Sequence, residues 1–167
     1  NGDRPGQRAQ DFPPVLADAV DRIHVQVASK APLRVVEPTV VTPIDEAIAK
    51  HVLGLIPAHP TLQFGIGATT DAIAEQLAHT GRRDLRVHSE MISDGTMKLV
   101  KSGSVIGKIR YSFALGSQAM LQWMNNNRRL WSGPSDVIND PRKLAAIKNL
   151  ISINTAVRVD LHGQANA

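Results

Sequence analysis

The chain carries a glutamate and a glycine turn whose residue types could work together in catalysis. Glu90 stands in the segment Val-His-Ser-Glu-Met-Ile-Ser-Asp-Gly, and it follows a turn that contains Gly65, Ile66, Gly67 and Ala68. A carboxylate can attack an activated carbonyl carbon, and glycine N–H groups at the start of a helix can hold an anion. Together these residues indicate covalent acyl chemistry on a thioester.

Each half of this pattern also has a purely structural interpretation. Two glycines after a strand can form an ordinary tight turn, and a full dinucleotide fingerprint would need glycine where Thr70 stands. Most glutamates are solvated surface residues, but Glu90 is expected at the end of a buried strand, beside apolar residues. At such a place its carboxylate could act as a general base or as a covalent nucleophile.

Other polar residues offer less chemistry. Asn139 precedes Asp140 and Pro141, where it could cap a helix or contact a ligand, and the cap is the interpretation favoured by these residues alone. His88 is expected to be packed or hydrogen-bonded. The six histidines show no metal-ligand spacing and the chain has no cysteine, so we expect neither a metal site nor a thiol nucleophile.

Composition narrows the class of partner. The 167 residues are 43% hydrophobic, which is enough for a sizeable core, and the net charge is +4. A modest positive charge suits an anionic small ligand such as a phosphorylated cofactor, whereas no long basic run interleaved with aromatics indicates nucleic acid. No apolar stretch reaches the roughly 20 residues of a membrane span. We therefore predict a cytoplasmic protein that binds neither nucleic acid nor membrane.

The elements that must position these residues alternate between strands and helices. This order predicts an α/β fold with an open, mainly parallel sheet and flanking helices, in which ligands bind outside the carboxyl ends of the strands. Helices are expected from Pro43 to before Pro57, with Thr42 as its cap, and over 71–79, 96–101, 118–125 and 141–149. Strands are expected over 23–27, 61–64, 85–88, 110–115 and 151–159, with an edge-like segment at 136–139.

Three local features complete the expected organisation. Residues 1–14 are rich in Gly, Pro, Arg and Gln and are predicted to form a flexible leader. Residues 69–71 are expected to cap the helix that follows the glycine turn. Asp94-Gly95 is predicted to be a turn.

Several segments carry a resemblance to a known family: Leu62–Ala68, His88–Gly95, Ser112–Ser117, Val137–Pro141, and Ser152–Ala156 with Val159–Gln164. In this order they resemble the acetyl-CoA hydrolase/4-hydroxybutyrate CoA-transferase family. The resemblance covers about residue 40 to the end and implies a class I CoA-transferase fold, with residues 15–167 as an incomplete C-terminal α/β lobe. Members of that family have a similar α/β domain before this one and a further glycine-rich motif after it.

The resemblance also implies roles for individual residues. In that family the glutamate of the His-Ser-Glu-Met motif is acylated and then carries CoA as a glutamyl thioester, a position that Glu90 occupies here. The glycine loop lines the CoA thioester site, and the asparagine of the Asn-Asp-Pro motif, here Asn139, contributes to the active site. The loop residues are Gly65, Ile66, Gly67, Ala68 and Thr69.

The expected function is therefore that of an acyl-CoA:carboxylate CoA-transferase. Its substrates would be an acyl-CoA and a small carboxylate, without a metal. Two alternatives stay open: an acyl-CoA hydrolase, such as an acetyl-CoA hydrolase, and a non-catalytic CoA-binding or assembly module. Exposed apolar surface would favour association with a second copy or with a partner lobe.

Overall fold

The computed structural model describes residues 33–38 and 40–166. The predicted leader at 1–14 and the predicted strand at 23–27 lie outside these residues. Among the helices of the described part, none is long and apolar enough to cross a membrane.

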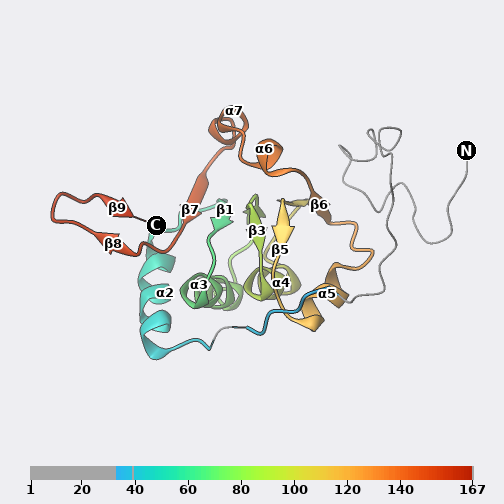
Figure 1. Cartoon of the computed structure of the whole chain (residues 1–167), viewed down its shortest axis with the longest axis horizontal. Helices are drawn as coiled ribbons and strands as arrows, with labels where there is room; N and C mark the ends of the chain where they lie inside the picture. Colours follow the sequence, from blue (N-terminus) through green and yellow to red (C-terminus); the bar gives the residue numbers. More distant parts are fainter. Residues whose placement is uncertain (1–32, 39, 167) are drawn as a thin grey trace, which may run out of the picture.

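The centre of the fold is a layer of short parallel strands, as predicted (Figure 1). β1 lies between β2 and β7, β4 pairs with β6, and a bridge between His88 and Arg110 joins the two groups. After this bridge the same two chain segments continue into β3 and β5, which again pair in parallel. The strands of the layer are β1 (Thr61–Phe64), β2 (Arg86–Val87), β3 (Met91–Ile92), β4 (Ile109–Tyr111), β5 (Phe113–Ala114), β6 (Leu130–Ser132) and β7 (Leu150–Ile153).

Helices cover one face of this layer more fully than the other. α3 and α4 run beneath the strands in Figure 1, α2 packs beside α3, and the short helices α6 and α7 lie on the opposite side. The core lies between the strands and these helices and contains Leu62, Phe64 and Ile92 from the strands, with Ile73 from α3 and Leu99 from α4. The helices are α2 (Pro43–Leu55), α3 (Ala68–His79), α4 (Asp94–Lys101), α5 (Gln118–Met124), α6 (Ser135–Ile138) and α7 (Pro141–Ala145).

The helix expected from Pro43 is confirmed as α2. The Thr42 hydroxyl accepts a hydrogen bond from the Asp45 N–H, and the Asp45 carboxylate accepts one from the Thr42 N–H, which is a complete capping box. Its apolar residues do not form a fully buried face, because Ile44 and Leu55 are 71% and 82% exposed. The local signals therefore set the bounds of α2, while packing contributes less than its periodicity suggests.

Two helices begin earlier than the sequence predicts. α3 starts at Ala68 with Gly67 as its N-cap, which makes no side-chain cap bond, so the expected cap at residues 69–71 is wrong. Gly67 has φ +126°, a conformation that glycine adopts without strain. α4 starts at Asp94, so Asp94-Gly95 is the first turn of a helix.

Tertiary contacts change the later elements. The strand expected over 110–115 divides at Ser112, because the N–H groups of Ser112 and Phe113 both donate to the Glu90 carbonyl, at 2.8 and 3.0 Å. The edge-like segment at 136–139 is instead the helix α6, and α7 ends at Ala145, four residues short of the predicted 149.

The strand expected over 151–159 ends at Ile153, and a hairpin follows it. β8 (Arg158–Val159) pairs antiparallel with β9 (Ala165–Asn166). The Asp160 carboxylate accepts from the N–H groups of His162 and Gln164, which closes the turn. This hydrogen-bonded turn ends the parallel pattern of the strands before it.

Candidate active site

The alternation of side chains along the strands gathers polar groups on the face opposite α3 and α4. Gln63 of β1 lies beside Ser152 of β7, and His88 follows Val87, the partner of Leu62. Because successive side chains of a strand point to opposite faces, Gln63, His88 and Ser152 share one face. Glu90 lies two residues after His88, and Asn154 lies two residues after Ser152. The side chains of all five residues line one cavity.

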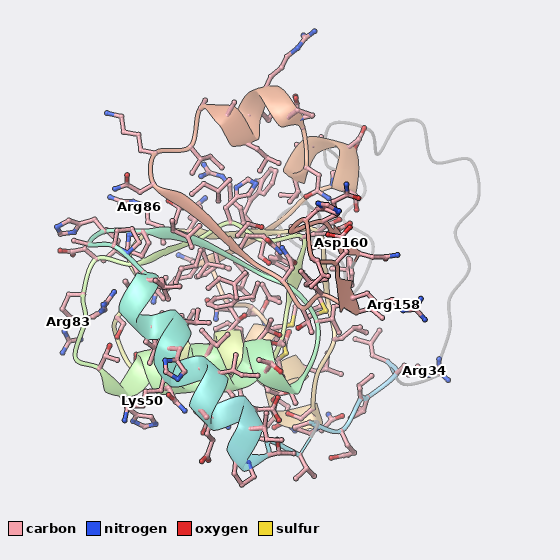
Figure 2. The ribbon with its side chains drawn as sticks, turned by 90° about the vertical axis from the view of Figure 1, so that its left-hand side faces the viewer. Arg34, Lys50, Arg83, Arg86, Arg158 and Asp160 are labelled. Atoms are coloured by element: carbon pink, nitrogen blue, oxygen red, sulfur yellow. The ribbon has the colours of Figure 1, made fainter. Side chains whose placement is uncertain are left out.

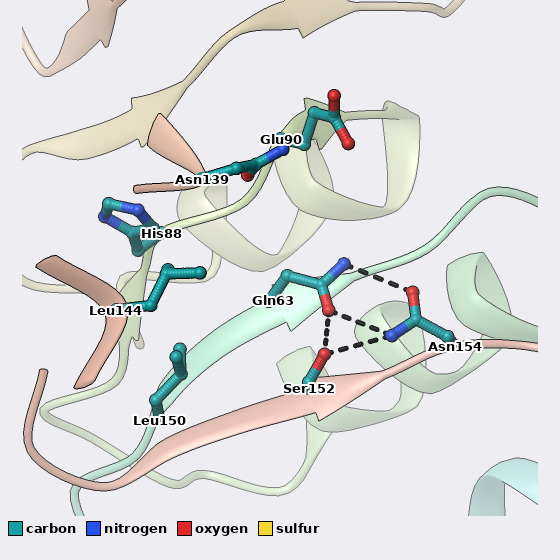
Figure 3. A pocket seen from close by; sticks show the side chains of 8 residues that line it. All are labelled: Gln63, His88, Glu90, Asn139, Leu144, Leu150, Ser152 and Asn154. Atoms are coloured by element: carbon teal, nitrogen blue, oxygen red, sulfur yellow. Dashed lines mark hydrogen bonds between the residues drawn. The ribbon is translucent and has the colours of Figure 1, made fainter. Parts of the chain in front are cut away.

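These side chains line a cavity of about 200 Å³. Figure 3 shows Leu144 and Leu150 on one side of it and the amide groups of Gln63 and Asn154 on the other. The predicted site residues Glu90 and Asn139 both line it. The cavity thus combines a carboxylate, several hydrogen-bonding groups and an apolar wall, which suits a small acyl group.

Glu90 is held by its main chain. Its carbonyl accepts the two hydrogen bonds from Ser112 and Phe113, and its side chain is half-buried at the cavity. Among the described residues, no hydrogen bond or ion pair engages its carboxylate. A carboxylate with this freedom can approach a bound carbonyl carbon.

The residues before Glu90 connect it to the rest of the site. The fully buried hydroxyl of Ser89 donates to the Phe64 carbonyl at 3.0 Å and accepts from the Phe64 N–H at 3.2 Å. Ser89 therefore ties the segment that carries Glu90 to the strand that leads into the glycine turn. Nε2 of the buried His88 lies 2.8 Å from the Ile138 carbonyl, so the bond requires the tautomer with its proton on Nε2.

That histidine bond fixes the segment that carries Asn139. Asn139 ends α6, where its N–H donates to the Ser135 carbonyl, and its side chain lines the cavity. The prediction that Asn139 caps α7 is wrong, because Asp140 is the N-cap of that helix and accepts from the Arg142 N–H at 2.9 Å. The cavity position favours the other interpretation of Asn139, a polar ligand contact.

The glycine turn lies next to the cavity without lining it. Gly65 follows Gln63 closely in the chain, but none of the residues 65–69 is among those that line the cavity. The Gly65 N–H donates to the Ile153 carbonyl at 2.8 Å, and the Thr69 hydroxyl donates to Asp45 at 2.5 Å. A role of this turn in holding CoA stays a prediction.

Two carboxylates behind Glu90 serve the packing of helices. Asp94 accepts from the N–H and the hydroxyl of Ser117, at 2.8 and 2.5 Å, and so joins α4 to α5. Burial raises the pKa of Asp71 above its ordinary value, although hydrogen bonds from the Ser93 hydroxyl and the Gly95 N–H oppose the shift. These contacts fix the start of α4, directly after the segment that carries Glu90.

Basic side chains on the α2 side of the molecule lie apart from one another. Figure 2 shows them around that side rather than gathered at one point; those labelled are Arg34, Lys50, Arg83, Arg86 and Arg158. A phosphate-binding cluster is therefore not formed by these residues.

Sequence reasoning did not select Gln63 and Ser152 as site residues. Both stand among apolar strand residues, Gln63 between Leu62 and Phe64 and Ser152 between Ile151 and Ile153. Polar side chains at alternate positions of neighbouring strands are a signal for one polar face. The signal becomes specific only when the register of β1 and β7 is known.

Comparison with known proteins identifies the family. Residues 116–167 match the model of the acetyl-CoA hydrolase/transferase C-terminal domain. The chain is 36% identical over 134 residues to the butyryl-CoA:acetate CoA-transferase of Anaerostipes caccae, covering 75% of the chain and 30% of that protein. It is 35% identical over 166 residues to the 4-hydroxybutyrate coenzyme A transferase of Clostridium kluyveri, covering 93% of the chain and 38% of that protein.

A solved structure shows the same fold. RipA from Yersinia pestis superposes with a TM-score of 0.78 and 29% identity, over 83% of this chain and 33% of RipA. The chain thus spans about a third of the length of the relatives it matches. It is similar to members of the acetyl-CoA hydrolase and CoA-transferase family, as the motifs around Glu90 and Asn139 predict, and residues 116–167 match the C-terminal domain of that family.

Proposed function

We propose that the chain is the C-terminal lobe, over residues 15–167, of an acyl-CoA:carboxylate CoA-transferase with Glu90 as its covalent nucleophile. One observation carries this proposal: the Glu90 carboxylate, Asn139 and the Gln63 amide line one cavity that also has an apolar wall. The relatives named above as CoA-transferases support the type of reaction. The expected substrates are an acyl-CoA and a small carboxylate.

The proposed reaction conserves the free energy of the thioester. A Glu90 carboxylate oxygen attacks the acyl carbon and the C–S bond breaks, which releases CoA as a thiolate and leaves a mixed anhydride on Glu90. The thiolate then attacks the glutamyl carbonyl carbon and expels the acyl carboxylate, which leaves a glutamyl-CoA thioester. An acceptor carboxylate reverses these two steps and leaves as the new acyl-CoA.

The surroundings of Glu90 suit this role. The two main-chain hydrogen bonds to its carbonyl fix the backbone, so that little reorganisation is needed before attack. The apolar wall formed by Leu144 and Leu150 limits water near the acyl carbon. A half-buried carboxylate without an internal partner among the described residues is free to react.

Hydrolysis of the acyl-CoA is a second candidate function. The matched family model describes hydrolases and transferases together. The two activities differ only in whether water or a carboxylate captures the acyl or glutamyl intermediate.

Trapping of the intermediate tests the proposal. The protein is incubated with acetyl-CoA, treated with hydroxylamine or borohydride, and mapped by mass spectrometry, with an adduct expected at Glu90. Glu90→Gln should abolish the adduct, while Glu46→Gln, on the exposed side of α2, should retain it. A folded wild-type protein that gives no adduct at Glu90 would contradict the covalent mechanism.

A competition experiment separates the two activities. Added butyrate should divert the acetyl-CoA reaction toward butyryl-CoA if the protein is a transferase. Release of free CoA at a rate that butyrate does not change would instead identify a hydrolase. Both outcomes require the Glu90 adduct, so this comparison follows the trapping experiment.

A further inference from the structure

A closed hydrogen-bond network surrounds the side-chain amide of Gln63. Oε1 of Gln63 accepts from the Ser152 hydroxyl and from Nδ2 of Asn154, the latter at 3.1 Å. Nε2 of Gln63 donates to Oδ1 of Asn154 at 3.3 Å, and Nδ2 of Asn154 also donates to the Ser152 hydroxyl at 3.0 Å. Figure 3 shows these bonds on the side of the cavity away from Leu144 and Leu150.

The Asn154 amide determines which way the Gln63 amide points. If Gln63 alone turned by 180°, its Nε2 would face the donor Nδ2 of Asn154, and its Oε1 would face the acceptor Oδ1 of Asn154. With Asn154 placed as it is, the orientation with Oε1 toward Ser152 avoids both mismatches. Nε2 carries two N–H groups and the network uses one of them, so the second remains for a ligand in the cavity.

The glycine turn provides the space for this network. A Cβ atom at position 65 would lie 2.7 Å from Oδ1 of Asn154 and 3.3 Å from its Cα atom. Asn154 can take its place beside Gln63 only because position 65 has no side chain. This steric relation is independent of the hydrogen bonds and links the Gly65 position to the cavity that contains Glu90.

We propose that Gln63 is a further catalytic residue, whose free N–H donates to the acyl oxygen of the substrate while Glu90 attacks the acyl carbon. Asn154 is then a positioning residue that acts by orienting the Gln63 amide. This inference rests on the proposed function. Negative charge develops on the acyl oxygen during attack, and a preoriented donor stabilises that charge more than it stabilises the ground state.

The cavity gives the acyl group a defined orientation for this contact. Gln63 and Glu90 line the same cavity, and Leu144 and Leu150 line its other side. An acyl chain against the two leucines leaves its carbonyl oxygen toward the amide. The carbonyl carbon then lies between the donor and the nucleophile.

Gln63→Glu is the direct test, because it keeps the accepting oxygen and replaces the donor by a second oxygen. A hydrogen bond to a charged group contributes about 1.5–3 kcal/mol, so the acylation rate of Glu90 by acetyl-CoA should fall by about 10- to 100-fold. The dissociation constant of free CoA should change little. Gln122→Glu, an exposed position on α5 outside the cavity, is the matched control and should acylate at the wild-type rate.

Asn154→Asp tests the positioning role with a different residue. Aspartate only accepts, so it should draw Nε2 of Gln63 toward itself and turn Oε1 toward the cavity. The acylation rate should fall as in Gln63→Glu, and the double variant should be no slower than either single variant. Additive losses would show that Asn154 acts independently of Gln63 and would overturn the positioning role.

A binding measurement keeps the inference separate from the covalent mechanism. The side-chain NH₂ signal of Gln63, assigned by its disappearance in Gln63→Glu, should shift when acetate is added to the protein. An adduct at Glu90 that forms equally fast in Gln63→Glu would overturn the role of Gln63 and leave the proposed function standing. An NH₂ signal that acetate does not shift would overturn it whether or not Glu90 is acylated.

Discussion

Replacement of Gly95 by alanine should destabilise the protein, although alanine is the better helix former. Gly95 is a buried residue in the first turn of α4, where it faces α3. A Cβ atom there would lie 2.7 Å from Oδ1 of Asp71, 2.9 Å from its Cα atom and 3.1 Å from its carbonyl oxygen. Because two of these atoms belong to the backbone of α3, rotation of one side chain cannot relieve the contact.

The magnitude follows from two opposing effects. Alanine in place of glycine inside a helix stabilises by about 0.5–1 kcal/mol, whereas overpacking of a tight contact costs about 1–3 kcal/mol. From the middle of the two ranges, the expected net loss for Gly95→Ala is about 1 kcal/mol in the free energy of unfolding. Gly54 of α2 is the matched control, because a Cβ atom there meets nothing within 4 Å and should give only the stabilisation.

Urea unfolding followed by tryptophan fluorescence measures both variants, since Trp123 and Trp131 are half-buried. The midpoint of Gly54→Ala should lie above that of the wild type and the midpoint of Gly95→Ala below it. A Gly95→Ala protein as stable as Gly54→Ala would refute the close approach of α3 and α4. The steric requirement for glycine at position 95 would then no longer hold.

Two further predictions concern buried polar groups. Ser89→Ala leaves the N–H and the carbonyl of Phe64 without their hydroxyl partner and should lower the free energy of unfolding in urea by about 1–3 kcal/mol. Ser135→Ala, at an exposed site, should lower it by less than about 0.5 kcal/mol. Equal losses would contradict the role of Ser89 in tying the Glu90 segment to Phe64. Burial raises the pKa of Asp71 above 3.8, so Asp71 binds a proton more tightly in the folded protein than in the unfolded chain. The stability that protonated Asp71 contributes is therefore lost as the pH rises through the raised pKa. Asp71→Asn removes this loss, so the stability of the variant relative to the wild type should rise from about pH 4 to pH 7. A relative stability that falls over this range would show that the pKa of Asp71 is lowered in the folded protein.

Elements with strong local signals could be predicted from the sequence. The capping box at Thr42 and Asp45 defines the start of α2, and the proline after Ile56 marks its end. The strand at Thr61–Phe64 and the helix that begins at Gln118 were predictable for the same reason, because turn and cap residues flank them. Such signals act over a few residues and do not depend on the rest of the fold.

Elements shaped by distant contacts could not be predicted in this way. The strand over 110–115 divides because two N–H groups share the Glu90 carbonyl, a contact that local propensity does not encode. The hydrogen bond between Ser152 and Gln63 joins residues 89 positions apart and depends on the register of β1 and β7. Glu90 and Asn139 were predicted from motifs, whereas the amide network beside them required the assembled layer.

The two glycines of the turn have different physical reasons, and only one of them concerns the cavity. Gly67 has φ +126°, and a Cβ atom at that position would meet nothing within 4 Å, so its backbone conformation rather than lack of space requires glycine. Gly65 has no such conformation, but a side chain there would displace Asn154 and release the Gln63 amide. Alanine at position 65 should therefore alter the acyl chemistry through Gln63, whereas alanine at position 67 should act on the start of α3.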